Sequence, residues 1–290
     1  MDQKVFAIFV SYNPEHSFVR NVERILHQGV WVIVVDNGSS LPSLTHVRAL
    51  EAYEKVIVLH NKTNMGIATA LNQGVKKALE LGAEYLFTFD QDSLAPNNFV
   101  SAMMGAWMEL EARGIRVGCL GPSWIDQVTE PEEVNNREEM YSFPEYIISS
   151  GMLINRATVA MVGPFRDDFF IDYVDVEFCL RCQQYGLRVA QFSGICLVHK
   201  LGNFRAHSIG GRKFYATHHN YVRRYYITRN RMLTWRAFAR DQPSWFLRDL
   251  KASLIEGLKV LLVEDDKLRK VVSMLRGCWD ALQGKTGMYA

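Results

Sequence analysis

The chain has 290 residues, of which 48% are hydrophobic and 22% are charged, and its formal net charge is +2. This composition is typical of a globular protein with one large domain, or with one domain and an appendage. The net charge is too small to imply a partner selected by charge. No apolar run approaches the roughly 18 residues that are needed to span a bilayer.

The five cysteines are irregularly spaced, which argues against a disulfide framework and suits a reducing cytosol. The few residues before the first apolar run, which begins at Val5, do not form a signal peptide. The sequence therefore predicts a cytoplasmic protein, either soluble or peripheral on the inner face of the cell membrane.

In the first hundred residues, short apolar runs alternate with segments of helical spacing. The helical spacing is visible at Phe18, Val22 and Ile25, and again over residues 66–81. This alternation predicts an α/β fold with a parallel, doubly wound sheet. The four predicted strands are 5–10, 30–35, 56–59 and 85–89.

Each predicted strand is followed by a polar, turn-forming segment. In parallel sheets, ligands bind beyond the carboxyl ends of the strands, so these four segments should line one binding edge. The segments are Ser11-Tyr12-Asn13-Pro14, Asp36-Asn37-Gly38-Ser39-Ser40, Asn61-Lys62-Thr63-Asn64-Met65-Gly66 and Asp90-Gln91-Asp92-Ser93.

The remainder of the chain changes character. Strands are predicted at 117–120, 147–154 and 187–192, and a helix at 174–185; from Tyr215 onward the pattern is helical, over 221–240, 245–263 and 268–282. We therefore expect a catalytic domain over 1–202. Residues 203–290 would form a basic loop and a helical appendage that contacts the acceptor, a membrane or a second subunit.

Asp90 and Asp92 are two carboxylates at the end of a strand. Oxygen ligands of this kind suit Mg²⁺ or Mn²⁺, and the cation would allow a diphosphate to lie beside them. The alternative is a solvated acidic turn, which the apolar strand before the pair makes less attractive. His199, at the end of another apolar run, could complete the metal shell or be structural.

Three further segments combine a chemical and a structural interpretation. Asp36 can accept the imide N–H of uracil or thymine, or cap an Asx-turn. Asn64 and Gly66 open a helix whose N-terminus favours anions, or cap it. Ser150 lies in a small polar turn suited to a sugar pocket or to a plain bend.

Asp175 is the candidate general base. It lies near the start of the predicted helix 174–185, in a segment that also contains Asp172. A carboxylate there could take the proton from an attacking hydroxyl, or simply complement the helix dipole.

The stretch from Asn203 to Arg240 contains nine Lys or Arg residues and no Asp or Glu. Arg224 and Arg229 could hold the phosphates of a nucleotide. The alternatives are a solvated basic face, a surface for anionic lipid, or a nucleic-acid interface. The nucleic-acid interpretation leaves the carboxylates unexplained, so no nucleic-acid partner is expected.

The order of these motifs resembles inverting glycosyltransferases of the GT-A fold, family two, and its details resemble the bacterial rhamnosyltransferase branch. The motifs are Ser11-Tyr12-Asn13, Asp36-Asn37-Gly38-Ser39, Asn64-x-Gly66, Asn72-x-Gly74, Asp90-x-Asp92, Ser149-Ser150-Gly151, Asp175-x-Glu177 and Arg223-Arg224-Tyr225-Tyr226-x-x-Arg229-Asn230. The resemblance spans Val5 to about Leu282.

The resemblance implies a dTDP- or UDP-sugar donor, with dTDP-L-rhamnose favoured, and a glycan or lipid-linked acceptor. It assigns base recognition to Asp36, metal binding to Asp92 with Asp90 toward the nucleotide, and the catalytic base to Asp175. It also places His199 in the metal site. UDP-galactofuranose and UDP-N-acetylglucosamine remain alternative donors, whereas a sugar nucleotidyltransferase would need a glycine-rich basic loop after the first strand. Peripheral membrane contact through the C-terminal helices and a homo-oligomer are further expectations.

Overall fold

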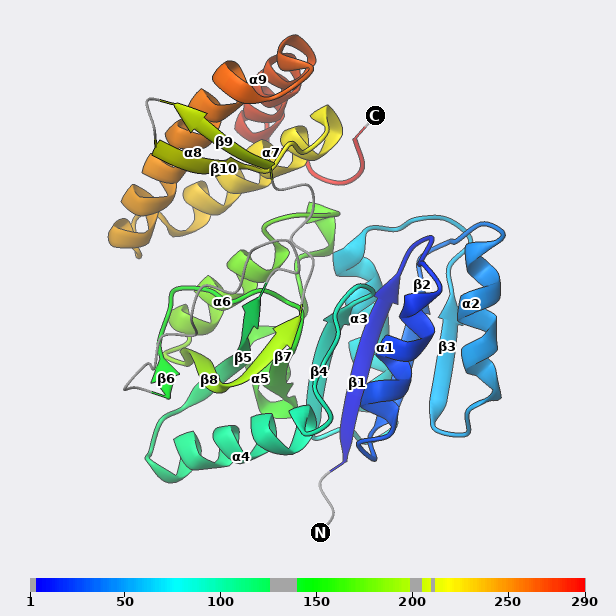
Figure 1. Cartoon of the computed structure of the whole chain (residues 1–290). Coiled ribbons are helices and arrows are strands. Elements are labelled where there is room, and N and C mark those ends of the chain that lie inside the picture. The colour runs from blue at the N-terminus through cyan, green and yellow to red at the C-terminus, as the bar shows by residue number, and fades with distance from the viewer. Residues whose placement is uncertain (1–3, 126–139, 199–204, 210–211, 290) are drawn as a thin grey trace. The chain divides into compact units, whose positions relative to one another are not determined.

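The computed structural model describes residues 4–125, 140–198, 205–209 and 212–289 (Figure 1). The chain divides into two compact units. The first, here called the sheet unit, comprises residues 1–167 and 174–200. The second, the helical unit, comprises residues 168–173 and 201–290. The short segment 168–173 falls inside the predicted range 1–202 but groups with the helical unit.

The sheet unit is built on one mixed sheet of eight strands in the order β3-β2-β1-β4-β7-β5-β8-β6. Strands β1, β2, β3 and β4 run parallel, whereas β7 is antiparallel to both β4 and β5. The strands are β1 (Val5–Ser11), β2 (Trp31–Asp36), β3 (Val56–His60), β4 (Tyr85–Asp90), β5 (Val117–Ile125), β6 (Tyr141–Ser142), β7 (Met152–Asn155) and β8 (Arg188–Val198). The predicted α/β architecture is confirmed.

Helices cover both faces of this sheet, which explains why its strands are apolar without alternation. The helices of the unit are α1 (Ser17–Leu26), α2 (Ser43–Ala49), α3 (Ile67–Glu80), α4 (Phe99–Ala112), α5 (Arg156–Val162) and α6 (Val174–Gln184), with a 3₁₀ turn at Leu50–Ala52. A second 3₁₀ turn, Asp167–Phe169, begins at the last residue before the segment that groups with the helical unit. Phe9 packs in one buried cluster with Phe18 of α1 and Trp107 of α4. The preceding residue of β1, Ile8, points to the opposite face of the sheet and packs against α3. A Cβ on Gly74 would lie 2.4 Å from the Cγ2 of Ile8, so close packing of α3 requires glycine there.

One expectation for the middle of the chain needs correction, and one helix was not predicted. The predicted strand 147–154 begins only at Met152, because Gly151 adopts a left-handed φ of +75° and residues 149–151 form a turn. The N–H of Gly151 donates to the Thr88 carbonyl (2.7 Å), which fixes the turn against β4. Helix α4, which the sequence analysis did not identify, is apolar nearly all round and therefore lacks a clear helical stripe.

In the part that the structure describes, the helical unit contains a hairpin and three helices. The hairpin pairs β9 (Arg205–Ile209) with β10 (Arg212–Ala216), where the sequence analysis expected a basic loop and then helix. The helices are α7 (Tyr221–Phe238), α8 (Pro243–Val263) and α9 (Lys267–Leu282), close to their predicted ranges. Within the described residues, no helix has both the length and the apolar character needed to cross a membrane.

Candidate active site

The parallel register brings the carboxyl ends of four strands to one edge of the sheet. Ser11 lies opposite Asp36, Asp36 opposite His60, and Val10 opposite Asp90. The hydroxyl of Ser11 is buried and makes no hydrogen bond to any residue that the structure describes. The predicted edge therefore exists, and residues from three predicted motifs occupy neighbouring positions on it.

The loops after β1, β2 and β4 are joined by hydrogen bonds. Tyr12 N donates to Gln91 Oε1 (2.8 Å), and Asn13 N donates to Ser39 Oγ (2.8 Å). Asn13 Oδ1 in turn accepts from Ser40 N (2.9 Å). Asn13 has a left-handed φ of 48°, a conformation that Asn tolerates better than most residues. The three loops thus form one cross-linked rim.

Asn37 connects the loop after β2 to the loop after β3. It is buried, and its Oδ1 accepts from Met65 N (2.9 Å) while its Nδ2 donates to Asn64 Oδ1 (2.9 Å). Asn64 Oδ1 also accepts from Gly66 N (2.9 Å), at the start of α3. The predicted residues Asn37, Asn64 and Gly66 are therefore brought together, and the side chains of Asn37 and Asn64 fix the shape of the rim.

The acidic pair follows β4 directly. Asp90 is half-buried and its N–H donates to Ser150 Oγ (3.3 Å), which also exchanges a hydrogen bond with Ser93 Oγ. Asp92 is exposed, in the turn that follows. Ser150 thus joins the turn after residue 149 to the acidic segment.

The donor set at this turn fits a divalent cation. The described residues contain no group of three or more His, Cys, Asp or Glu side chains that could hold a metal ion, so a cation here would have only two protein carboxylates among them. Asp90 and Asp92 supply carboxylate oxygens, the ligands that Mg²⁺ and Mn²⁺ prefer. Mg²⁺ usually takes one or two protein carboxylates and completes its shell with water and substrate phosphates.

Asp36 is 2% exposed, and its carboxylate already has partners. Oδ1 accepts from Ser39 N (3.3 Å), and Oδ2 lies 3.3 Å from Nδ1 of His60. The other ring nitrogen of His60 is 2.8 Å from Glu51 Oε1. The hydrogen bond to Glu51, and then the contact with Asp36, raise the pKa of His60, while partial burial opposes them. Asp36 is consequently held in one orientation at the end of β2.

Asp175 is half-buried in the first turn of α6. Its Oδ1 accepts from the Val176 N–H (2.8 Å). Glu177, two residues later, is buried and paired with Arg181 (2.7 Å), which gives it a structural role. Of the two acids in this helix turn, Asp175 remains the candidate base.

Asp172 belongs to the helical unit and is paired with Arg223 through three N–O distances of 3.0 to 3.2 Å. Burial raises the pKa of Asp172, and Arg223 opposes that shift. Phe170, Asp172 and Tyr173 all have positive φ, between 63° and 66°. Asn230 holds this strained loop by donating to the carbonyls of residues 169, 171 and 172 at 2.8 to 3.0 Å.

Arg224 and Arg229 were predicted to hold nucleotide phosphates, but the structure uses both inside the helical unit. Arg224 is 1% exposed and paired with Glu256 and Glu264. Arg229 is fully buried and donates to the carbonyls of Phe169 (3.1 Å) and Gly287 (2.6 Å). Their burial also removes two cations from the surface that a nucleic-acid interface would need.

His199, the predicted third metal ligand, lies outside the described residues. Val198, which precedes it in the chain, forms a bridge with Leu94 (N–O distances of 2.9 and 3.1 Å). The end of β8 is therefore hydrogen-bonded to the segment that follows Asp92.

The sequence analysis placed Gln91 on the predicted edge without a role, and it did not identify His60 as a contact of the site. Gln91 holds the loop after β1 through its side chain, and its carbonyl accepts from Asn21 Nδ2 (3.0 Å). His60 contacts Asp36. Both positions carried a usable signal, since Gln91 lies between the two aspartates and His60 is the last residue of β3.

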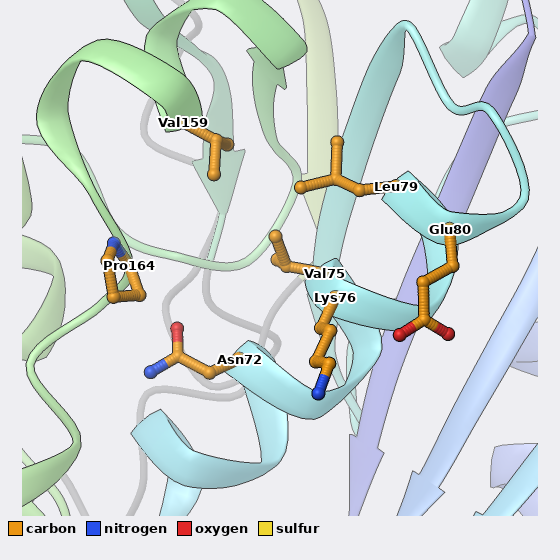
Figure 2. A pocket seen from close by; sticks show the side chains of 7 residues that line it. All are labelled: Asn72, Val75, Lys76, Leu79, Glu80, Val159 and Pro164. Atoms are coloured by element: carbon orange, nitrogen blue, oxygen red, sulfur yellow. The ribbon is translucent and has the colours of Figure 1, made fainter.

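A shallow cavity of about 410 Å³ lies on the sheet unit between α3 and the segment from α5 to Pro164 (Figure 2). It is lined by Asn72, Val75, Lys76, Leu79, Glu80, Val159 and Pro164. None of the predicted site residues lines it. Asn72, which belongs to a predicted motif, uses both side-chain atoms on the backbone of Phe165 (2.8 and 2.9 Å). The cavity therefore shares no described residue with the predicted site at the sheet edge.

Comparison with known proteins identifies the class. Residues 6–150 match the model of Glycosyl transferase family 2, a range that contains the rim residues from Ser11 to Ser150. The chain belongs to this family and is a glycosyltransferase.

A curated relative extends the match to the whole chain. The dTDP-rhamnosyl transferase RfbF of Shigella flexneri is 30% identical over 306 residues, which cover 99% of this chain and 98% of the relative.

Solved structures agree on the fold. The S. aureus TarS fragment 1–349 in complex with UDP-GlcNAc has a TM-score of 0.64 at 15% identity, and the match covers 98% of this chain and 82% of that one. The mannosyltransferase PcManGT from Pyrobaculum calidifontis, in complex with GDP-Man and Mn²⁺, has a TM-score of 0.60 at 16% identity, covering 97% and 88%. The GT-A-like fold expected from the sequence is confirmed.

Proposed function

We propose that the enzyme transfers L-rhamnose from dTDP-L-rhamnose to a hydroxyl of a glycan or lipid-linked acceptor, with inversion at the anomeric carbon. The observation that carries this proposal is the register of β1, β2 and β4, which places Ser11, Asp36 and Asp90 side by side on one edge. Donor binding and catalysis are assigned to the sheet unit, and acceptor contacts to the helical unit.

The donor's nucleotide would lie along the rim. Asp36 is buried and held by Ser39 and His60, so its carboxylate is positioned to accept the imide N–H of thymine. The loops around it are fixed by the Asn13 and Asn37 hydrogen bonds, so little ordering entropy is lost when the base binds.

A divalent cation held by Asp90 and Asp92 would neutralise the diphosphate and stabilise it as a leaving group. Two carboxylates beside a diphosphate repel it, so donor binding at this turn depends on that cation. His199 remains the proposed additional ligand.

Asp175 would act as the general base. It takes the proton from the acceptor hydroxyl while the hydroxyl oxygen attacks the anomeric carbon on the face opposite the diphosphate. A single displacement of this kind inverts the anomeric configuration. The proton ends on Asp175 and the negative charge on the departing dTDP.

The choice of sugar is supported by the relative from Shigella flexneri, whose name specifies a dTDP-rhamnosyl transferase and whose similarity extends over nearly the whole chain. The test is a donor panel of dTDP-L-rhamnose, UDP-galactofuranose and UDP-N-acetylglucosamine, with hydrolysis and transfer measured in Mn²⁺ and in Mg²⁺. Preferential use of dTDP-L-rhamnose is expected. Turnover of a UDP-sugar alone would overturn the donor, and the anomeric configuration of the product, read by NMR, tests inversion.

A further inference from the structure

Helices α8 and α9 carry apolar stripes that face solvent. On α9 the exposed stripe recurs at intervals of four and three residues, which keeps it on one side of the helix. Leu268, Trp279 and Leu282 are 78%, 61% and 67% exposed. The exposed large apolar residues of the two helices are Leu247, Leu254, Ile255, Leu258, Leu261 and Leu262 on α8, and Leu268, Val272, Leu275, Trp279 and Leu282 on α9.

These stripes are not a core that failed to find partners, because the opposite faces of both helices are occupied by α7. Glu256 and Asp249 of α8 point inward and pair with Arg231 of α7. On α9, Asp280 accepts from the Tyr225 hydroxyl (2.8 Å), and a Cβ on Gly277 would lie 2.8 Å from the Tyr225 carbonyl oxygen. Helix α9 thus directs polar and small residues inward and leucines outward, the reverse of an ordinary surface helix. Helix α8 buries Trp245 and Val260 and also turns its leucines outward.

The charges on these helices are segregated in the same sense. The structure describes both helices completely, and along them every exposed charged residue is basic. These residues are Arg248, Lys251, Lys267, Arg269 and Arg276. Among the acidic residues of the two helices, Asp249 and Glu256 are half-buried and Asp280 is buried. Each of the three is paired with a cation. The outward faces of the two helices therefore combine leucine and tryptophan with positive charge, while the connection between them adds the exposed Asp265 and Asp266, which lie 3.3 Å from Arg205 and 3.9 Å from Arg269.

We propose that this outward surface of α8 and α9, the Leu247–Leu282 surface, binds the interface of a bilayer containing anionic phospholipid. Leucine and tryptophan side chains enter the boundary between headgroups and acyl chains, and flanking lysines and arginines attract the anionic headgroups. A second copy of the chain fits less well, because a symmetric interface would bring the same cations together. The transfer reaction itself does not require binding to a bilayer, but such binding would bring the enzyme close to a lipid-linked acceptor.

The test is sedimentation of the full chain with vesicles, without donor or acceptor. Wild-type protein is expected to bind vesicles of phosphatidylcholine and phosphatidylglycerol (7:3) more tightly than vesicles of phosphatidylcholine alone. The triple variant Leu254→Gln/Leu258→Gln/Leu262→Gln should lose about tenfold or more in vesicle affinity, because each substitution removes apolar area from the contact with the membrane. The double variant Arg248→Gln/Lys251→Gln should lose the preference for anionic vesicles and become less sensitive to salt.

Met108→Gln/Met161→Gln, which changes two half-exposed apolar residues of the sheet unit, is the matched control and should bind vesicles as wild type does. All variants change exposed positions, and circular dichroism checks their folding; the charge variant keeps the test decisive should the leucine variant not fold. Equal binding of wild type and both variants would overturn the proposal, as would equal binding of wild type to neutral and anionic vesicles. A wild-type dimer in sedimentation equilibrium that the leucine variant converts to monomer would assign this surface to a second copy instead.

Discussion

The rim of the sheet and helix α7 are the two regions richest in motif residues, and they use them differently. On the rim, uncharged side chains such as Asn13 and Asn37 make the structural hydrogen bonds, and Asp92 stays exposed at the surface. On α7, the charged side chains themselves are structural, since Arg224 and Arg229 are buried and paired. A motif shows that a residue type is needed, whereas burial and partners show whether a ligand or the fold needs it.

The largest effect expected at the site comes from Asp175→Asn. The amide cannot take the proton of the acceptor hydroxyl, so the transfer rate should fall by about 10²- to 10⁴-fold while donor affinity is kept. Transfer kinetics and calorimetric donor binding measure the two quantities. Asp167→Asn, an exposed neighbour in the chain, is the control and should retain its rate. Full turnover by the Asp175 variant would remove it as the base.

Arg224→Met should distinguish helix α7 from the rim, because it should lower the stability of the protein without lowering its affinity for the donor. It removes one of the two cations that pair with the buried Glu264 and leaves Lys270 at 2.8 Å, so the free energy of unfolding should drop by roughly 1–3 kcal/mol, as is typical when a hydrogen bond to a buried charged group is lost. Urea unfolding measures the loss. Arg236→Met, an exposed position on the same helix, should change stability little.

Donor affinity decides how Arg224 is interpreted. The folded Arg224 variant should bind dTDP-sugar as wild type does. A variant of normal stability with much weaker donor binding would instead restore the phosphate-binding role predicted from the sequence.

Asp92→Ala tests the rim itself. Donor affinity in Mn²⁺ should weaken about tenfold, equivalent to ~1.4 kcal/mol, because the cation loses a charged ligand. The difference in affinity with and without Mn²⁺ should shrink as well. Titration of donor at both conditions measures this, with Glu54→Ala as an exposed acidic control. Affinity unchanged by Mn²⁺ in wild type would contradict the metal site.

The smallest expected effect is a pH dependence from His60. Its folded pKa is raised above the unfolded value of about 6.5, first by Glu51 and then by Asp36, so its contribution to stability is full below that value. The contribution disappears as the pH rises through the folded pKa. Because the side chain is 38% exposed, about 0.5 kcal/mol or less is expected.

Chemical unfolding of wild type and His60→Gln between pH 5 and pH 8.5 measures this term. The difference in stability between the two proteins should be larger at the acidic end. Parallel curves would show that the contacts of His60 with Glu51 and Asp36 do not favour its protonated form.

The rim could be predicted because each of its parts is local in sequence. An apolar run such as 30–35 defines a buried strand, and the residue after it, Asp36, must then lie at the strand's carboxyl end. Parallel pairing brings such ends together whatever the rest of the chain does. Helix α4 was missed because it is apolar over most of its length, so its sequence shows no clear helical stripe. The hairpin β9–β10 was missed because each strand depends on pairing with the other.

By itself, the sequence determined the order of strands and helices in the first hundred residues, the acidic pair after β4 and the family, because these depend on periodicity and on motifs within a few residues. Only the tertiary structure decided which charges face solvent. Arg224 and Arg248 are both arginines on helices of one unit, yet the first is buried against two carboxylates and the second is exposed beside a leucine stripe. The energy of a charge depends on its distance to opposite charges and to water, and those distances exist only once the chain is folded.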